Sequence, residues 1–265
     1  MMASSRVALA LLVGSLSSSW SHGGSAQTQE AEASWQVLAV QYARSGDVPS
    51  VRWGGSPEGP EVRPMSWHFL VLRRGNQVVL IDCGTDRFQS SSSARERWNV
   101  IWHRGVVEAL RAAGIAPESV TDIILTHHHW DHAGGLHHFL NARTHLDRAE
   151  WARLPRATRR RLLDTGGVRF VRDGGSVDGV RMMRSGAHTR GSLMVEAACR
   201  EGQILMVGDA VYFPEQLGEL PRGAALSERV AAGPLRAVIT GHDSALFRVY
   251  PQLAEGVALL CEGSG

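Results

Sequence analysis

The stretch Ile123-Ile124-Leu125-Thr126-His127-His128-His129-Trp130-Asp131-His132-Ala133-Gly134-Gly135 holds most of the information about fold and chemistry. Its first three residues are apolar and predict a short buried strand, Ile123 to Leu125. A helix is expected to begin near Ala133. Gly134 and Gly135 suit a backbone that must pack closely against a neighbour.

The polar residues of this stretch have the spacing of metal ligands. In an extended chain, residues i and i+2 point to the same side, so His127 and His129 can offer their imidazoles to one metal ion. His128 should then face away. Asp131 and His132 come where the chain turns into the helix, and this adjacent pair can reach a second ion beside the first.

Three later residues each follow a hydrophobic strand: His188, Asp209 and His242. The ends of strands are where an α/β scaffold gathers a site. Together with the first group they make five imidazoles and two carboxylates. Such a set of nitrogen and oxygen donors fits zinc, iron, manganese or cobalt, and the absence of thiolates argues against an iron–sulfur cluster or copper electron transfer.

Other charged residues invite a less specific interpretation. His137, His138 and His145 are expected to line the following helix and strand rather than to bind a third ion. The arginines between Arg153 and Arg161 predict a solvated helical face.

The rest of the chain predicts one α/β domain of residues 27–265. A hairpin through Arg74-Gly75-Asn76 and a helix that stops at Gly114 are expected before the histidine-rich stretch. A largely helical end is expected from Ala245 to Leu260, interrupted at Pro251. The expected strands are Trp35–Tyr42, Trp67–Leu72, Val78–Ile81, Val168–Val171, Val180–Met183, Ser192–Glu196, Ile204–Val207 and Ala237–Ile239.

The amino-acid composition argues against several classes of function. The chain has 265 residues, with 28 basic and 26 acidic side chains and a formal charge of +2, and every basic residue is arginine. The absence of lysine removes Schiff-base and P-loop chemistry. The small charge argues against nucleic acid as a partner, which leaves a small-molecule substrate.

The N-terminus resembles an export signal. An apolar run from Val7 to Leu16 leads to Gly24-Ser25-Ala26, so residues 1–26 are expected to be a signal peptide and the protein to be exported, periplasmic or secreted. The run is too short for a stable membrane anchor. The three cysteines are widely spaced without a CxxC pair, so no disulfide framework is expected and they are expected to be thiols.

The strand ends and the histidine-rich stretch of this chain resemble those of the metallo-β-lactamase superfamily. The likeness is carried by Ile81-Asp82-Cys83-Gly84, the His127 to His132 motif, Gly186-Ala187-His188, Gly208-Asp209 and Gly241-His242. It implies an αβ/βα four-layer sandwich, in which two mixed β-sheets are flanked by helices. It also implies two divalent metal ions, with zinc as the first choice and iron, manganese or cobalt as alternatives. His127, His129 and His188 would hold the first ion, Asp131, His132 and His242 the second, and Asp209 would bridge them.

Within that superfamily the chain is most similar to the N-acyl homoserine lactonases. Asp209-Ala210-Val211-Tyr212 matches their bridging aspartate followed by a catalytic tyrosine, and Gly241-His242-Asp243 matches their last ligand segment. Two departures from the superfamily pattern, Ala187 and Cys83, remove no ligand. The resemblance implies hydrolysis of a lactone.

The mechanism expected from such a ligand set is attack by a hydroxide that bridges the two ions. Tyr212 would polarise the carbonyl oxygen, and Asp131 would pass a proton to the departing alkoxide. Asp82 and Asp243 are candidates to accept a hydrogen bond from a ligand histidine, or to cap a strand or helix end.

Two alternatives to a lactonase are also compatible with the sequence. One is a secreted metallo-hydrolase that acts on β-lactams or organophosphate esters with the same site. The other is a non-enzymatic metal-binding or nucleic-acid module, which the complete ligand set and the near-zero charge disfavour.

Overall fold

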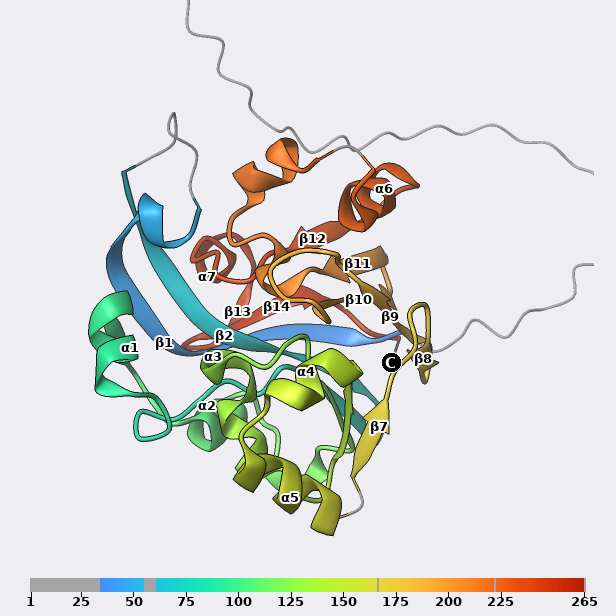
Figure 1. The fold of residues 1–265 in the computed structure, drawn as a ribbon. Coiled ribbons are helices and arrows are strands. Elements are labelled where there is room, and N and C mark those ends of the chain that lie inside the picture. Colours follow the sequence, from blue (N-terminus) through green and yellow to red (C-terminus); the bar gives the residue numbers. More distant parts are fainter. Residues whose placement is uncertain (1–33, 55–60, 166, 222, 265) are drawn as a thin grey trace, which may run out of the picture. The chain divides into compact units, whose positions relative to one another are not determined.

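Two β-sheets pack face to face between layers of helices in the computed structural model of the chain (Figure 1). The structure describes residues 34–54, 61–165, 167–221 and 223–264, which belong to one compact unit. The expected αβ/βα sandwich is confirmed. The expected signal peptide and the domain start at residue 27 lie outside the described residues.

The larger sheet is mixed and has nine strands among the described residues. β1 to β3 are antiparallel neighbours, with the expected hairpin between β2 and β3, while β3, β5, β6 and β7 run parallel. Eight strands follow the order β13 (Gln252–Ala254), β14 (Val257–Cys261), β1 (Gln36–Pro49), β2 (Val62–Arg74), β3 (Gln77–Ile81), β5 (Asp122–Ile124), β6 (Arg143–Leu146) and β7 (Val168–Phe170). The ninth, β4 (Val100–Trp102), pairs with Ala43 to Ser45 of β1.

The smaller sheet has five strands in the part of the chain that the structure describes. β11 and β12 run parallel, and the remaining pairs are antiparallel. Its order is β12 (Ala237–Ile239), β11 (Gly202–Met206), β10 (Leu193–Cys199), β9 (Val180–Arg184) and β8 (Ser176–Val177).

Helices cover the outer faces of both sheets. In Figure 1, α2 and α5 lie below the larger sheet and α6 lies above the smaller one. The α-helices are α1 (Ser92–Trp98), α2 (Val106–Ala112), α3 (Trp130–Ala133), α4 (Arg148–Arg153), α5 (Arg156–Asp164), α6 (Ala225–Ala231) and α7 (Leu246–Val249). Short 3-10 turns are η1 (Ser50–Arg52), η2 (Pro117–Ser119), η3 (Gly134–His138), η4 (Gly208–Ala210) and η5 (Pro214–Glu219). No described helix has the length and apolar character needed to cross a membrane.

The central strand β1 shows how the sequence produces this layering. Its residues alternate between two separate apolar cores because successive side chains of a strand point to opposite faces. Val37 and Ala39 pack into the core between the sheets, whereas Leu38 and Val40 pack into the core beneath α2 and α5. Both faces of β1 are therefore buried, and the strand sits at the centre of the molecule.

The C-terminal segment differs from the expected helical end. Only α7 is helical, and after Pro251 the chain forms β13 and β14. Residues Val257 to Cys261 pair with the first half of β1. The expectation was wrong because this pairing joins segments more than 200 residues apart, which local periodicity does not reveal.

The cysteines also differ from expectation. Cys199, at the end of β10, forms a disulfide with Cys261, at the end of β14, and Cys83 is a buried free thiol. The bond joins the smaller sheet to the larger one. Both cysteines end a strand, and only the packing of the two sheets brings them together.

Candidate metal centre

Three histidines converge at the edge where β5 ends. His127 and His129 lie in the extended segment between β5 and α3, and His188 lies in the loop that follows β9. His127 Nε2 is 3.0 Å from His129 Nδ1, and His188 Nε2 lies 3.1 Å and 2.9 Å from these two atoms. The structure thus brings together the three residues expected to hold the first ion.

A second group lies beside the first. His132 Nε2 lies 3.1 Å from Asp131 Oδ2 and 3.1 Å from Asp209 Oδ1. His242 Nε2 is 3.6 Å from the same Asp131 oxygen and 3.3 Å from the same Asp209 oxygen. All four residues are buried. They are the residues expected around the second ion.

Asp209 belongs to both groups. Its Oδ1 faces His132 and His242, while its Oδ2 lies 3.8 Å from His127 Nε2 and 3.6 Å from His188 Nε2. One carboxylate therefore offers one oxygen to each group, which is the geometry of a bridging ligand. Gly241 permits it, because a Cβ at that position would lie 2.5 Å from Asp209 Oδ1.

The donor atoms fit two divalent cations. His132 Nε2 and Asp209 Oδ1 are buried without a hydrogen-bond partner, which is unfavourable unless another group uses their lone pairs. Zinc lies about 2.0–2.1 Å from its histidine nitrogens, and one cation at that distance from three nitrogens accommodates spacings near 3 Å. The nitrogen and oxygen donors are also the ones that such metals prefer.

Charge in the centre also favours cations. Burial would raise the pKa of Asp209, but His132 and His242 outweigh it and hold that pKa well below its usual range. Burial would lower the pKa of His132, but Asp209 and Asp131 outweigh it and raise that pKa. Both shifts show that the carboxylates are ionised and stabilise positive charge beside them, and a bound cation can take the place of the protons on the imidazoles.

Several ligand histidines are held through their outer nitrogens. His132 Nδ1 lies 2.7 Å from Asp82 Oδ2, and His242 Nδ1 donates to the Ser66 carbonyl at 2.9 Å. His127 Nδ1 lies 3.0 Å from Thr126 Oγ1, and that hydroxyl donates to Asp82 Oδ2. A proton fixed on the outer nitrogen leaves the inner nitrogen free to bind a metal.

The two aspartates proposed for this supporting role differ. Asp82 follows β3 and accepts hydrogen bonds from both Thr126 and His132 in a buried position. Asp243 instead accepts a hydrogen bond from the Ala245 amide at 2.8 Å and caps the turn before α7. Asp82 is thus the supporting residue, and Asp243 is a cap.

Glu150 is a supporting residue that the sequence did not single out. It lies in α4, is 1% exposed, and accepts hydrogen bonds from the His128 amide, the Thr189 hydroxyl and the Gly191 amide. His128 Nδ1 lies 2.6 Å from the same carboxylate. Glu150 therefore ties the loop of His127 and His129 to the loop of His188. His128 faces away from the metal cluster, as its strand phase predicts.

The helix that follows His129 begins earlier in the chain than expected. α3 begins at Trp130, three residues before Ala133, so Asp131 and His132 lie in its first turn. A Cβ on Gly134 would lie 2.2 Å from Thr85 Oγ1, and one on Gly135 would lie 2.1 Å from a backbone carbonyl oxygen. The expected close packing at these glycines is confirmed.

The remaining histidines of the histidine-rich stretch lie outside the cluster of seven residues. His145 on β6 pairs with Asp122 at 2.7 Å. His137 and His138 lie in η3 beside Asp86, with His138 in contact with its carboxylate. These positions agree with the expectation that the three line the following helix and strand.

Tyr212 lies over the cluster, two residues after η4. Its ring stacks on His242 at 5.1 Å between centroids and meets His188 edge-on at 5.9 Å. Burial, and next the Asp209 carboxylate, raise its pKa. The phenol therefore stays protonated and can donate a hydrogen bond to an oxygen of a bound molecule.

A cavity of about 270 Å³ opens beside the cluster. It is lined by His129, Asp131, Asp209, Tyr212 and His242 on the metal side and by Met65, Trp67, Arg97, Trp98 and Trp130 on the other. The tryptophan rings meet at 6.1 Å for Trp67 and Trp98 and at 5.2 Å for Trp67 and Trp130. Such a wall suits a small molecule with an apolar part.

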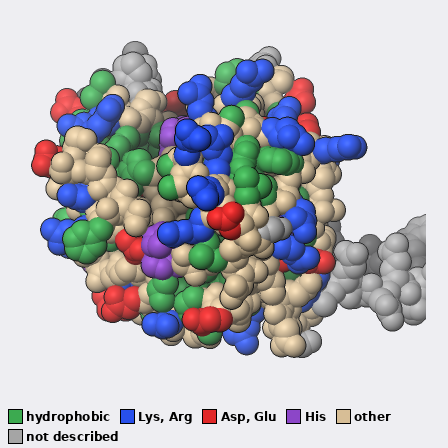
Figure 2. Space-filling view, turned by 60° about the horizontal axis from the view of Figure 1, so that its bottom comes forward, with side chains coloured by type: hydrophobic (Ala, Val, Ile, Leu, Met, Phe, Trp, Pro, Cys, Tyr) green, Lys and Arg blue, Asp and Glu red, His purple; other side chains and the backbone are tan. Residues whose placement is uncertain are grey.

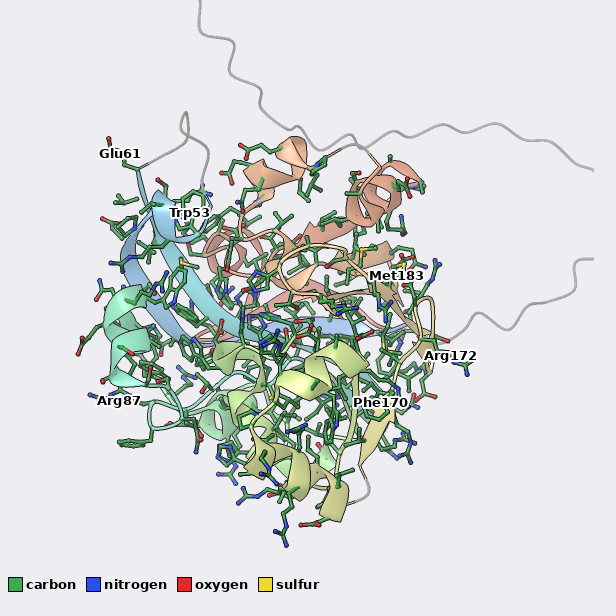
Figure 3. The ribbon with its side chains drawn as sticks, in the orientation of Figure 1. Trp53, Glu61, Arg87, Phe170, Arg172 and Met183 are labelled. Carbon is green, nitrogen blue, oxygen red and sulfur yellow. A yellow bond between two sulfur atoms is a disulfide. The ribbon has the colours of Figure 1, made fainter. Side chains whose placement is uncertain are left out.

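A small apolar cluster supports this cavity from behind. Met65 packs there with Val48, Trp53 and Phe213, and Figure 3 labels Trp53 close to the bend of β1 and β2. Trp53 and Phe213 meet edge to face at 4.8 Å. Phe213 directly follows Tyr212, so the cluster also anchors the tyrosine segment.

Part of the chain that contains the clustered residues matches a known protein family. Residues 65–246 match the family described as the metallo-beta-lactamase superfamily. That range includes all seven residues of the two clustered groups. No curated protein sequence matches the chain.

Solved structures share the fold. An AiiA variant from B. thuringiensis with N-decanoyl-L-homoserine bound at the active site has a TM-score of 0.64 and 20% identity, over 80% of this chain and 94% of that one. An N-acyl homoserine lactone hydrolase with its product N-hexanoyl-L-homoserine at the catalytic metal centre has a TM-score of 0.61 and 20% identity, over 80% and 93%. The dizinc quorum-quenching lactonase AidC has a TM-score of 0.53 and 16% identity, over 80% and 92%.

Proposed function

The chain belongs to the metallo-β-lactamase superfamily and is a metal-dependent hydrolase, and we propose that it opens a lactone of the N-acyl homoserine type at a centre of two divalent cations. One observation carries the proposal. Asp209 offers an oxygen to each of the two groups, and Tyr212 lies three residues later with its ring against both His188 and His242.

The residues divide into two binding sets that share Asp209. His127, His129 and His188 form the first set, and Asp131, His132 and His242 form the second. Two divalent cations bound there, zinc in the first place, would polarise a carbonyl group and lower the pKa of water. Asp82 and Glu150 keep the ligand loops in position.

Tyr212 and Asp131 supply the protein's own part of the chemistry. The protonated Tyr212 hydroxyl donates to the carbonyl oxygen of the lactone as negative charge develops on it. Burial would raise the pKa of Asp131, but His132 outweighs it and keeps that pKa low. The ionised Asp131 can accept a proton and deliver it to the ring oxygen that leaves as an alcohol. The net reaction adds water across the ester bond.

The cavity agrees with a substrate that has an apolar chain. The wall of Trp67, Trp98 and Trp130 presents rings to the space beside Tyr212. Burying a methylene group on such a surface contributes about 0.8 kcal/mol. The structural neighbours that contain N-acyl homoserines support the same substrate class.

We also propose that the protein acts outside the cytoplasm. The N-terminal segment of residues 1–26 has the pattern of a signal peptide. The Cys199–Cys261 disulfide supports the proposal, because such bonds persist in oxidising compartments. A mature terminus near Gln27, found by mass spectrometry of the native protein, would agree, and an intact Met1 or Met2 in a cytoplasmic fraction would refute it.

The test of the substrate class is a comparison of wild type and Tyr212→Phe on a homoserine lactone, a β-lactam and a phosphotriester. Loss of one oxyanion donor lowers turnover by about 100- to 1,000-fold, so lactone opening should fall by that order while the metal content stays at its wild-type value. β-Lactam and phosphotriester turnover should change less. Undetectable lactone opening by fully metallated wild type, with brisk turnover of either other substrate, would overturn the assignment.

A further inference from the structure

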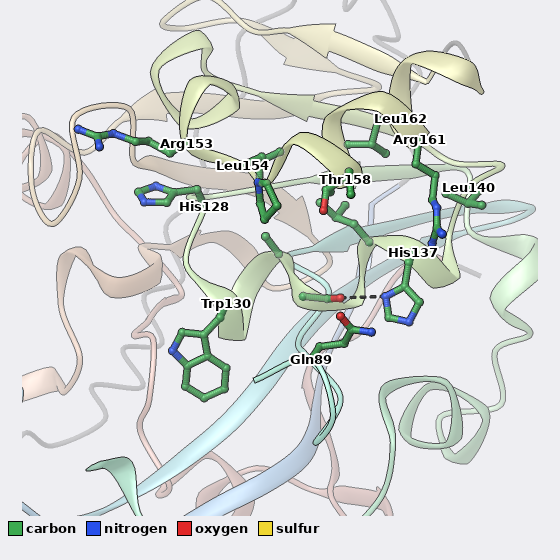
Figure 4. A pocket seen from close by; sticks show the side chains of 15 residues that line it. Gln89, His128, Trp130, His137, Leu140, Arg153, Leu154, Thr158, Arg161 and Leu162 are labelled. Atoms are coloured by element: carbon green, nitrogen blue, oxygen red, sulfur yellow. Dashed lines mark hydrogen bonds between the residues drawn. The ribbon is translucent and has the colours of Figure 1, made fainter. Parts of the chain in front are cut away.

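A second cavity, larger than the one at the metal centre, lies between η3 and the pair α4 and α5 (Figure 4). Its volume is about 430 Å³, which falls within the range of roughly 300–1,000 Å³ of small-molecule sites. Trp130 lines both cavities. We call the second cavity the α5 cleft, and the proposed lactone chemistry makes no use of it.

The inner wall of the α5 cleft is apolar. Leu136, Leu154 and Leu162 are buried beneath it, and Leu140 is half-buried at one end. Ala157, which lies on α5 like Leu162, also lines the cleft and is exposed. An alkyl chain laid along this lining would lose contact with water along its length, which favours binding by about fourfold for each methylene buried.

The charged side chains that line the cleft are all basic. Arg153 and Arg161 are among the lining residues, and no aspartate or glutamate is. Within the described ranges, neither guanidinium forms an ion pair with a carboxylate. Figure 2, which brings the α5 side of the molecule forward, shows arginines spread among apolar side chains on this face.

The two arginines lie at opposite ends of the cleft in Figure 4. Arg161 extends toward His137, while Arg153 lies near His128. His137 Nδ1 donates to the Gly134 carbonyl at 2.9 Å, which holds its ring at the wall. The Asp86 carboxylate, which lies 3.7 Å from His137 Nε2, is already in contact with His138 and accepts a hydrogen bond from the Val106 amide at 3.1 Å. The Arg161 guanidinium is therefore available to an incoming anion.

We propose that the α5 cleft binds an amphipathic carboxylate, with its carboxylate on Arg161 and its alkyl chain along the apolar lining that reaches solvent at Trp130, Leu140 and Ala157. A guanidinium binds a carboxylate through charge-assisted hydrogen bonds, and the exposed part of the apolar lining provides the surface for the chain. Two sources share this chemistry: a free medium-chain fatty acid and an N-acyl amino acid such as N-acyl homoserine. The proposal does not depend on the lactonase assignment.

The test is calorimetric titration of the metal-loaded protein with octanoate. Acetate, which has the charge without the chain, and 1-octanol, which has the chain without the charge, are the ligand controls. Both should bind at least about tenfold more weakly than octanoate. Equal binding of octanol and octanoate would overturn the proposal, because the guanidinium would then have no role.

Three variants locate the bound molecule. Arg161→Gln should weaken octanoate binding by about tenfold, whereas Arg160→Gln, a matched change at the next position of the same helix and outside the cleft, should leave it unchanged. Ala157→Trp places a large ring in the cleft and should abolish binding. Thermal unfolding checks that each variant folds.

Octanoate could also bind at the metal centre, and the variants separate this outcome. Binding only there would give the same isotherm for wild type, Arg161→Gln and Ala157→Trp, which would overturn the proposal. A parallel titration with N-octanoyl-L-homoserine distinguishes the sources. Tighter binding than octanoate, with the same dependence on Arg161, supports an N-acyl amino acid, and the reverse order supports a fatty acid.

Discussion

The most informative perturbation of the metal centre is Asp82→Asn, which changes a residue that the proposed mechanism does not place in contact with metal or substrate. Asp82 Oδ2 accepts from the Thr126 hydroxyl at 2.8 Å and faces His132 Nδ1 at 2.7 Å, while Oδ1 accepts from the Thr126 amide at 2.7 Å. Every one of these contacts uses the carboxylate as an acceptor. An asparagine of the same shape keeps one acceptor oxygen and replaces the other with an amide group that donates.

The consequence falls on the tautomer of His132. If the asparagine amide faces Nδ1, the ring is favoured with its proton on Nε2, the atom 3.1 Å from both Asp131 and Asp209. A proton there blocks metal binding. Loss of such an outer hydrogen bond typically costs 10- to 100-fold in metal affinity, or about 1.4–2.7 kcal/mol. We expect a loss of this size for the second ion and little change for the first.

The assay is competition for zinc with a chromophoric chelator, which resolves two successive dissociation constants. Asp243→Asn is the matched control, because Asp243 directly follows His242 in the chain and its carboxylate accepts from the Ala245 amide. The Asp243→Asn variant should bind both zinc ions with wild-type affinity. Wild-type affinity of Asp82→Asn for both ions, in a protein with unchanged secondary structure, would refute the argument that Asp82 sets the tautomer of His132.

Four further predictions concern other parts of the structure. The double variant Cys199→Ser/Cys261→Ser opens a loop with a sequence separation of 62 and should lower the free energy of unfolding by about 4 kcal/mol, as measured by urea denaturation; an unchanged value would contradict the disulfide. Glu150→Gln should weaken binding of the first ion by about 10- to 100-fold in zinc competition, because it loosens both ligand loops. His128→Ala should keep two ions per chain by elemental analysis. Gly135→Ala should lower the free energy of unfolding by at least about 1–3 kcal/mol in the same urea assay, because its Cβ would meet a backbone carbonyl.

The parts of the fold and of the candidate site that the sequence predicted from its own residues depend on local patterns, whereas the four-layer sandwich and the full set of seven residues were expected from the family resemblance. The continuous apolar run from Val37 to Val40 indicates a strand that is buried on both faces. The spacing of His127 and His129 places two imidazoles on one side of an extended segment. Such patterns can be recognised from a few consecutive residues, because they depend on the repeat of the strand and not on contacts with the rest of the chain.

What the sequence did not predict depends on contacts between distant segments. Glu150 reads as an ordinary helical glutamate, and only the packing of α4 against the loops of His128 and Gly191 buries it with four donor groups around it. Cys199 and Cys261 carry no local signal of pairing. Residues Val257–Cys261 form a strand because β1 offers a free edge, which overrides their helical pattern.

The proposed function requires that the seven clustered side chains hold two divalent cations, with Asp209 shared between them. Elemental analysis of gently purified protein, before and after reconstitution with zinc, tests it most directly. We expect two ions per chain for the wild type and a smaller value for Asp209→Ala, which removes the shared carboxylate while leaving both histidine groups in place. One ion or none in reconstituted wild type, or two tightly held ions in Asp209→Ala, would contradict it.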